Sequence, residues 1–434
     1  MTTTAIQNNK KITELRCFKS STLSLPLIVL LFSDHFFPAE LTFLLGLCYL
    51  AYLLVCFSKK NINLNPFVLL IIILIFTGST LEIINFQTNF TDSRDFIRDL
   101  YYYLFPCVFF LVGQLFSYKK NAICSIIKTY IFAGFLLGIL SLFRLLFHAA
   151  FHDLAFNSVR DFLGYGFPEC FISFFFTILL MKKNLINKRK GSIIIFFDLI
   201  NIIFSFSRTW LFALFIFIFF IFLKNISLKN AMKELFCFFT VILLLLLILK
   251  IFSPFTLIGE FYNKIINSFG EMFSGNDWAN PSVVVNNWRG YEFHCAIVQW
   301  RGENFFEKLF GRGLGQRIYV SEYGYLVYSS VAGESNEYLP VLHNGYGSLL
   351  IKNGILGIAI YFLIWIIAFR DGYKLVKRNQ LLGKTMMSIA IILPCFTFFS
   401  CGIFKHDSYF RLCILLGFCE QIYKLYKSST RSQY

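Results

Sequence analysis

Long apolar runs are the feature that most limits what this chain can fold into. A helix needs roughly 20 apolar residues to cross a bilayer, and runs near that length recur along the whole sequence. They fall at about 22–36, 40–57, 67–86, 99–117, 123–147, 167–181, 191–206, 209–223, 234–254, 344–369, 385–404 and 408–423. Because 57% of the 434 residues are hydrophobic and only 15% are charged, a soluble domain could not bury them all. The sequence therefore predicts an all-α polytopic membrane protein with about 12 transmembrane helices.

The distribution of Lys and Arg predicts the orientation of the helices. If the amino terminus is cytoplasmic, most of the 40 Lys and Arg residues fall in segments on that side, namely 1–21, 58–66, 118–128, 182–190, 224–233, 370–384 and 424–434. Cytoplasmic loops carry such an excess, so both termini are predicted to be cytoplasmic. The net charge of +16 follows from this topology. Since the charges form no basic domain, no nucleic-acid partner is expected.

The apolar runs divide the chain into three parts. Residues 1–254 hold helices one to nine, residues 255–342 form one large polar loop on the outer side, and residues 343–434 hold helices ten to twelve. Within the loop, the spacing of Tyr291, Cys295 and Val298 predicts an amphipathic helix over 289–301. No disulfide framework is expected, because Cys295 is the only one of the twelve cysteines in the loop.

Two arginines on the outer side have two interpretations each. The hexapeptide 205–210 is predicted to be a short outer turn between two helices, which puts Arg208 at the membrane face. An arginine there commonly reaches lipid head groups, but its planar guanidinium also suits phosphate oxygens. Arg289 stands at the expected amino end of the loop helix. It is either a solvated loop residue or a phosphate ligand beside a helix terminus.

His343 and Asn344 join the polar loop directly to an apolar run, in the sequence HNGYGSLLIKNGILG. An imidazole at this edge of the membrane can accept a proton from a hydroxyl group at neutral pH. Gly354 and Gly357 follow at a spacing that suits close helix packing. No carboxylate stands beside His343 in the sequence, so its ionisation is expected to follow ambient pH unless a tertiary partner intervenes.

Taken in order, these elements resemble the O-antigen ligase and O-antigen polymerase superfamily. The matching residues are the turn Ser207 and Arg208, the loop arginine Arg289, the Gly-x-Gly-x-Gly element Gly311, Gly313 and Gly315, and the helix start His343, Asn344, Gly354 and Gly357. The resemblance covers about residues 190–370. The first six helices match only in number and hydrophobicity.

The resemblance implies an inverting, GT-C-type glycosyltransferase of the bacterial inner membrane that uses no metal, cofactor or nucleotide sugar. Its substrate would be a glycan on undecaprenyl pyrophosphate, presented in the periplasm, where the loop 255–342 would lie. Arg208 and Arg289 would contact the pyrophosphate, and His343 would act as the base or position the acceptor hydroxyl. Asn344 and the five glycines would support the site. Membrane lipid, the lipid A core and a chain-length regulator are the further partners that it implies.

Three other interpretations stay open. A ligase differs from a polymerase only in its acceptor, and a polymerase is preferred because the 57 Phe residues and the weak similarity outside the motifs are typical of a polysaccharide-cluster gene. A flippase or secondary transporter would instead use charges at membrane depth, namely Glu82, Arg144, Asp198 and Lys352. An accessory membrane subunit is the third. In an enzyme, Lys352 would be a second phosphate contact or a charge lining the cavity, about 12 Å below His343 on the same helix.

Two further groups of residues complete the candidate chemistry. His148 and His152 have a spacing compatible with a metal, but they lack a third ligand, so no metal site is predicted. If His343 only positions the acceptor, the carboxylates to consider as base are Glu292, Glu334 and Glu337.

Overall fold

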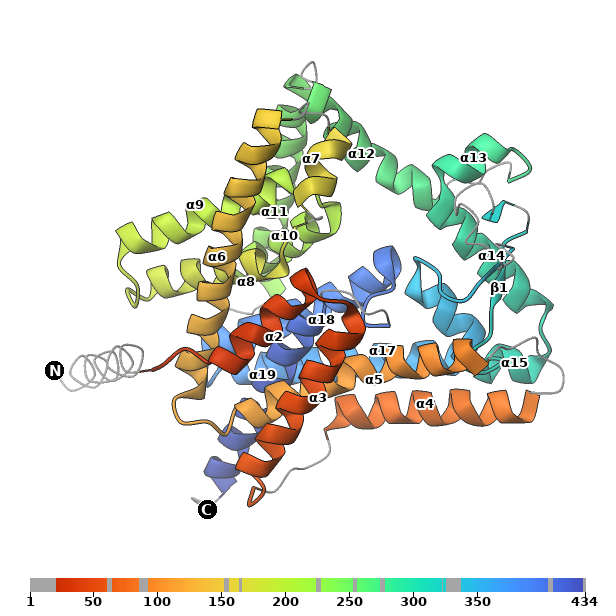
Figure 1. Ribbon diagram of the computed structural model, residues 1–434, viewed down its shortest axis with the longest axis horizontal. Coiled ribbons are helices and arrows are strands. Elements are labelled where there is room, and N and C mark those ends of the chain that lie inside the picture. The colour runs from red at the N-terminus through yellow and green to blue at the C-terminus, as the bar shows by residue number, and fades with distance from the viewer. Residues whose placement is uncertain are drawn as a thin grey trace.

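The computed structural model describes residues 21–60, 65–85, 93–151, 156–163, 166–223, 228–252, 256–273, 278–321, 323–324, 337–404 and 409–431. These residues are mostly helical, and one short antiparallel pair of strands joins Ile318 to Leu339 and Tyr319 to Tyr338 (Figure 1). The elements are α2 Leu25–Phe36, α3 Ala39–Cys56, α4 Pro66–Asn85, α5 Ser93–Phe116, α6 Ala122–Phe151, α7 Phe156–Leu163, α8 Pro168–Lys182, α9 Lys188–Phe204, α10 Arg208–Phe222, α11 Leu228–Ile251, α12 Thr256–Phe273, α13 Pro281–Asn286, α14 Trp288–Gly302, α15 Phe305–Phe310, β1 Ile318–Tyr319, β2 Tyr338–Leu339, α17 Gly345–Val376, α18 Gln380–Ser400 and α19 Phe410–Arg431.

The all-α membrane class is confirmed. Each predicted apolar run coincides with a helix, although the ends differ by several residues. Among the described residues, six helices are long and apolar enough to cross a membrane: Ala39–Cys56, Pro66–Ile84, Ser93–Phe116, Ala122–Phe151, Gly345–Val376 and Gln380–Ser400. Leu25–Phe36 and Arg208–Phe222 are apolar but shorter. A multi-pass membrane protein is therefore established, while twelve crossings remain a prediction.

The central packing involves α5, α17, α18 and α19. Helix α5 lies along α19, and α17 lies along α18 (Figure 1). Small residues allow the first contact, because a Cβ added at Gly113 would lie 1.9 Å from the carbonyl oxygen of Ile414, and one at Gly417 would lie 2.0 Å from that of Phe110. Membrane helices that lack a hydrophobic driving force associate through such close backbone approach.

Helices α6, α8 and α9 pack together in a second group, and α12, the first helix of the segment 255–342, runs from beside α7 and α11 to α14 (Figure 1). The loop has a core of its own, which includes Val284, Trp288, Ile318 and Leu342 and reaches α17 at Ile351. This shared core fixes the loop on the outer part of α17.

The predicted loop helix is confirmed as α14, with a different buried face. The spacing argument placed Val298 on the apolar stripe, but Val298 is exposed. The residues of α14 that are buried are Trp288, Gly290, Tyr291, Glu292 and Ala296. A buried carboxylate on this face is a departure from simple apolar periodicity, and it requires a polar partner.

The Gly-x-Gly-x-Gly segment fastens the loop to the helices. Gly311, Gly313 and Gly315 have φ values of +86, +113 and +89°, which glycine adopts without strain. A Cβ at Gly313 would lie 2.6 Å from the backbone nitrogen of Glu82 in α4. These glycines let the backbone of the loop approach the backbone of the helices, and they contribute no reactive side chain.

The Gly-x-Gly-x-Gly segment docks at a break in α17. Gly354 has φ +64° and ψ −164°, so the regular helical hydrogen bonds stop there. The carbonyl oxygen of Ile351 instead accepts the N–H of Arg312 at 2.9 Å, and that of Lys352 accepts the N–H of Gly313 at 3.1 Å. Backbone groups of the loop therefore satisfy carbonyls that the broken helix leaves open.

This docking predicts a large difference between two glycines of the loop. Gly313→Ala is expected to lower stability by about 2 kcal/mol or more, because it adds both a strained φ and a backbone clash. Gly302→Ala is the control, since a Cβ there meets nothing within 4 Å, and its stability should equal or slightly exceed that of the wild type. Thermal unfolding of the purified protein measures both. Equal melting temperatures for the two variants would contradict the docking role.

Candidate functional site

His343 is held rigidly at the point where the loop enters α17. Its backbone carbonyl accepts the N–H of Cys401 at 2.6 Å. The next residue, Asn344, is the N-cap of α17, and its side-chain oxygen accepts the N–H groups of Tyr346 at 3.0 Å and Gly347 at 3.3 Å. Asn344 thus satisfies donors that a helix start leaves open. Its role in positioning His343 is to fix the helix start.

The buried carboxylate of Glu292 contacts both the backbone and the ring of His343. Glu292 Oε2 accepts the backbone N–H of His343 at 2.8 Å, and Glu292 Oε1 lies 3.0 Å from His343 Nδ1. The Glu292 side chain is 0% exposed, whereas that of His343 is 38% exposed. A carboxylate only accepts hydrogen bonds, so Nδ1 carries a proton and the lone pair of a neutral ring lies on Nε2. The ring is oriented as a general base requires.

No carboxylate stands beside His343 in the sequence, but the fold supplies one as a tertiary partner. The partner comes from α14, 51 residues earlier in the sequence. Sequence spacing cannot reveal such a contact. One indication was present in the sequence: Glu292 directly follows Tyr291, a residue on the predicted apolar face of the loop helix.

Arg289 lies on α14, the helix that also carries Glu292. It precedes Glu292 by three residues, and residues at that spacing share one face of a helix. Arg289 is half-buried. The structure therefore places Arg289 on the helix whose Glu292 contacts His343.

Arg208 begins α10, directly after its N-cap Ser207. Its guanidinium donates to the carbonyl oxygen of Lys264 in α12 at 2.7 Å. Phe206 in the same turn packs against Phe261 of α12, with ring centroids 5.1 Å apart. Helix α12 in turn contacts α14. Arg208 is therefore linked to the candidate site through α12, whereas the contacts around His343 involve α14 and α17.

Lys352 has a partner of its own. Its ammonium lies 2.6 Å from Asp99 Oδ2 of α5 and donates to the carbonyl oxygen of Pro340 at 2.7 Å. Asp99 also accepts the N–H of Gly315 at 2.7 Å. Both charged side chains are almost fully buried. This internal ion pair neutralises Lys352, and it joins α5 and α17 to the glycine segment.

The remaining glycines of the motif also serve packing. A Cβ at Gly354 would lie 2.4 Å from the carbonyl oxygen of Leu309, and one at Gly357 would lie 2.3 Å from the Cβ of Asn353. Gly354, together with Gly311, Gly313 and Gly315, lets the loop and the broken helix meet, whereas Gly357 leaves room for the side chain of Asn353 within α17.

A cleft of about 660 Å³ opens on the outer side of α14. Its lining includes Tyr291, His294 and Cys295 of this helix and Tyr319 and Tyr338 of the β pair. Partial burial, followed by the charge of Arg301, lowers the pKa of His294 below its ordinary value. The ring is thus neutral at neutral pH. Tyr291 is next to Glu292 in sequence, so the cleft and the His343–Glu292 pair lie on one helix.

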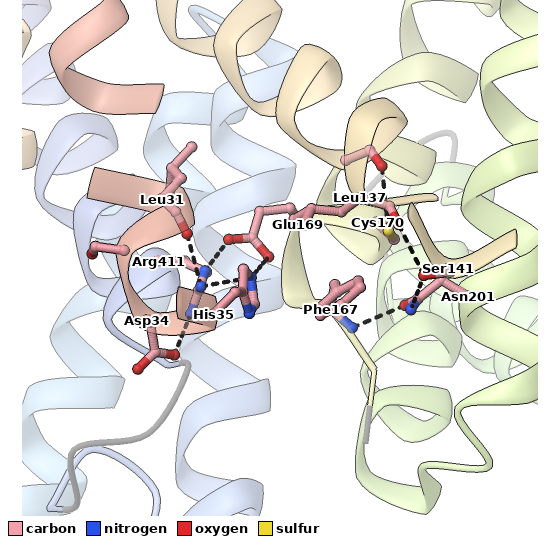
Figure 2. Close-up of polar contacts among 12 residues, drawn as sticks. Leu31, Asp34, His35, Leu137, Ser141, Phe167, Glu169, Cys170, Asn201 and Arg411 are labelled. Atoms are coloured by element: carbon pink, nitrogen blue, oxygen red, sulfur yellow. Dashed lines mark hydrogen bonds and ion pairs between the residues drawn. The ribbon is translucent and has the colours of Figure 1, made fainter. Parts of the chain in front are cut away.

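A second cluster of polar groups is buried among α2, α8 and α19 (Figure 2). The Arg411 guanidinium contacts Glu169 through Nε, Asp34 Oδ2 at 3.0 Å, His35 Nε2 at 2.8 Å and the carbonyl oxygen of Leu31 at 2.8 Å. His35 Nε2 also lies 3.2 Å from Glu169 Oε2. The Arg411 side chain is 0% exposed. Its neighbours are spread over three helices, which explains why no sequence pattern reveals the cluster.

The charges that a transporter would use have local partners where the structure shows them. Asp198 accepts a hydrogen bond from Ser173 at 2.7 Å, and Arg144 lies over the ring of Phe167 at 5.6 Å. Within the described ranges, no group of three His, Cys, Asp or Glu residues is placed to hold a metal. His148 lies 3.0 Å from Ser158 Oγ. His152 and Glu334 lie outside the described residues.

No protein-family model matches this chain, and a search of the curated proteins gives no match. The motifs themselves, with the contacts that surround them, are therefore what any functional assignment has to rest on.

The Arg411 cluster predicts a strong dependence of stability on one side chain. Arg411→Met would leave the carboxylate of Glu169 buried without its cation, which typically costs about 3–5 kcal/mol. Arg370→Met is the matched control, because Arg370 is 59% exposed beside Asp371 and such pairs contribute about 0–1 kcal/mol. Detergent-solubilised protein would be compared by thermal unfolding. A melting temperature of the Arg411 variant equal to that of the Arg370 variant would show that the cluster does not stabilise the bundle.

Proposed function

We propose that this protein is a glycosyltransferase of the bacterial inner membrane that transfers a glycan from undecaprenyl pyrophosphate on the periplasmic side. Twelve membrane crossings, cytoplasmic termini and a periplasmic location of residues 255–342 belong to the proposal. A multi-pass helical protein suits a substrate whose carrier is a membrane lipid, and the apolar helices support that much.

The observation that carries the proposal is the grip of Glu292 on His343. The buried carboxylate accepts both the backbone N–H and Nδ1 of His343, at 2.8 and 3.0 Å. A carboxylate in this position fixes the tautomer of the ring and stabilises the imidazolium that forms when Nε2 takes up a proton. A histidine with only a structural role at the end of a loop does not need a buried carboxylate to fix its tautomer.

The reaction follows from these roles. His343 Nε2 takes the proton of an acceptor sugar hydroxyl, whose oxygen forms a bond to the anomeric carbon of the donor glycan. The bond between that carbon and the phosphate oxygen breaks, and undecaprenyl pyrophosphate leaves with the electron pair. Attack from the face opposite the leaving group inverts the anomeric configuration. Arg208 and Arg289 bind the charge that develops on the leaving pyrophosphate.

The acceptor separates the two forms of the proposal. A polymerase passes the growing chain to a new lipid-linked repeat unit, whereas a ligase passes it to the lipid A core. We favour the polymerase, which would work beside a chain-length regulator. Deletion of the gene distinguishes them on a lipopolysaccharide gel: core with a single repeat unit indicates a polymerase, and core alone with accumulating lipid-linked polymer indicates a ligase.

A transporter is the competing class, and the buried Arg411, Glu169 and His35 cluster is the observation in its favour. The opposite charges in this cluster contact each other directly, which suits a structural ion pair better than a substrate pathway. Turnover of lipid-linked glycan by purified protein separates enzyme from transporter, since a flippase moves the glycan without changing its covalent bonds.

The first prediction from this mechanism concerns the base. His343→Gln keeps hydrogen bonding but loses basicity, so turnover should fall by about 10² to 10⁴. Glu292→Gln should also reduce turnover. An amide can donate as well as accept a hydrogen bond, so it no longer fixes the tautomer that carries a proton on Nδ1. Glu260→Gln, an exposed change on α12, is the control. Release of undecaprenyl pyrophosphate from a glycan-loaded donor measures all three. Near-normal turnover by the His343 variant would move the base to another group, with Glu337 the next candidate.

The second prediction concerns the arginines. Ala at Arg208 or at Arg289 should abolish transfer while protein levels stay near normal, because each guanidinium is assigned to the leaving pyrophosphate. Lys at either position should restore only part of the activity, since it supplies a point charge and not a planar fork. The same release assay, with protein levels measured on immunoblots, provides the test. Full activity of Arg208→Ala would leave that residue as a structural link to α12.

A further inference from the structure

Four aromatic side chains, Trp278, Tyr291, Tyr319 and Tyr338, are among the residues that line the cleft beside α14. Tyr319 and Tyr338 face each other across the β pair with ring centroids 5.0 Å apart, and they are 49% and 44% exposed. Trp278 and Tyr291, with centroids 5.5 Å apart, line the cleft as well. The volume of about 660 Å³ falls within the range of roughly 300–1,000 Å³ usual for ligand pockets. Exposed rings gathered in one concave site favour a ligand with flat, partly apolar faces.

A buried hydrogen-bond acceptor in the cleft has no partner. Gln316 lines it and is 8% exposed. Its Nε2 reaches the carbonyl oxygen of Arg317 at 3.4 Å, but its Oε1 makes no hydrogen bond. A buried acceptor left unpaired is costly, so such a group usually serves a ligand or another bound molecule. Because Oε1 can only accept, the ligand that it suits carries O–H or N–H groups.

The charges around the cleft are compensated. Arg312 lies 3.4 Å from Glu303 and 3.7 Å from Glu307, and Arg317 is paired with Asp95 of α5. The lowered pKa of His294 keeps that ring neutral at neutral pH. A cleft whose cations already have carboxylate partners offers little excess positive charge to a pyrophosphate. It suits a neutral molecule rich in hydroxyl groups.

We propose that this cleft binds the glycan part of the substrate, with sugar rings lying against Tyr319, Tyr338 and Trp278. Gln316 Oε1, which is buried behind the surface of the cleft, accepts from a sugar hydroxyl after its side chain turns toward the cleft. The proposal deepens the transferase function and rests on it for the identity of the glycan. It assigns the cleft a task separate from that of the arginines, namely holding sugars of the chain while the reacting end lies at His343. Helix α14 couples the two places, because Tyr291 lines the cleft and Glu292 holds the histidine.

Binding of free glycan tests this directly. Full-length protein in lipid nanodiscs is titrated with short oligosaccharides released by mild acid from the surface polysaccharide of the cells that make it. Nanodiscs are used because maltoside detergents carry sugar head groups that would compete. Calorimetry measures affinity, and the fluorescence of Trp278 in the cleft provides a second signal. Tyr319→Ala and Tyr338→Ala should each weaken binding by about tenfold, and both are surface changes that leave folding intact.

Three controls make the result decisive. Phe305→Ala removes an aromatic ring that is 82% exposed outside the cleft, so its affinity should equal that of the wild type. Excess inorganic pyrophosphate should leave the glycan affinity unchanged. His343→Gln should bind free glycan normally although its turnover falls by about 10² to 10⁴, which separates failure of the cleft from failure of the transferase assignment. Wild-type protein that does not bind the oligosaccharides, tyrosine variants that bind like wild type, or competition by pyrophosphate would each overturn the proposal.

Discussion

The outer half of the molecule depends on an exchange of backbone hydrogen bonds at the break in α17. Gly354 ends the regular helix, and the carbonyl oxygens of Ile351 and Lys352 turn to the N–H groups of Arg312 and Gly313. The buried pair of Lys352 and Asp99 closes the same junction from the side of α5. These contacts set where the loop sits relative to the helices. Through the loop they also set where α14 presents Glu292 to His343.

The fold was largely predictable because the apolar runs obey a single physical requirement. A helix that faces lipid has to satisfy its own backbone and present apolar side chains over its full length, so hydropathy alone located every helix from α2 to α6 and from α17 to α19. The helix boundaries were less predictable. Helix α5 starts at Ser93, well before its apolar run, because Asp95 pairs with Arg317 of the loop and Asp99 pairs with Lys352 of α17.

The candidate site was predictable only in part. His343 and Asn344 were recognisable because they stand at an abrupt change from polar to apolar sequence. Glu292 was considered only as an alternative base, and its contact with His343 was not predictable, since nothing along the chain links it to a residue 51 positions later. The glycines were recognised for their spacing, but their function in the structure is to let backbones meet. Lys352 was interpreted as a second phosphate contact or a charge lining the cavity, because its pairing with Asp99 on a distant helix could not be read from the sequence. In each case the missing information was a long-range contact.

The Arg411 cluster constrains how this sequence can change over evolutionary time. Its members come from α2, α8 and α19 (Figure 2), and loss of any one charge would strand the others in a region with little water. Single substitutions there are therefore poor intermediates, while joint replacement of the whole set by apolar residues preserves the packing. Among descendants of this chain, the positions of Asp34, His35, Glu169 and Arg411 should accordingly change together, and they provide an internal register for aligning sequences too divergent to be matched by similarity alone.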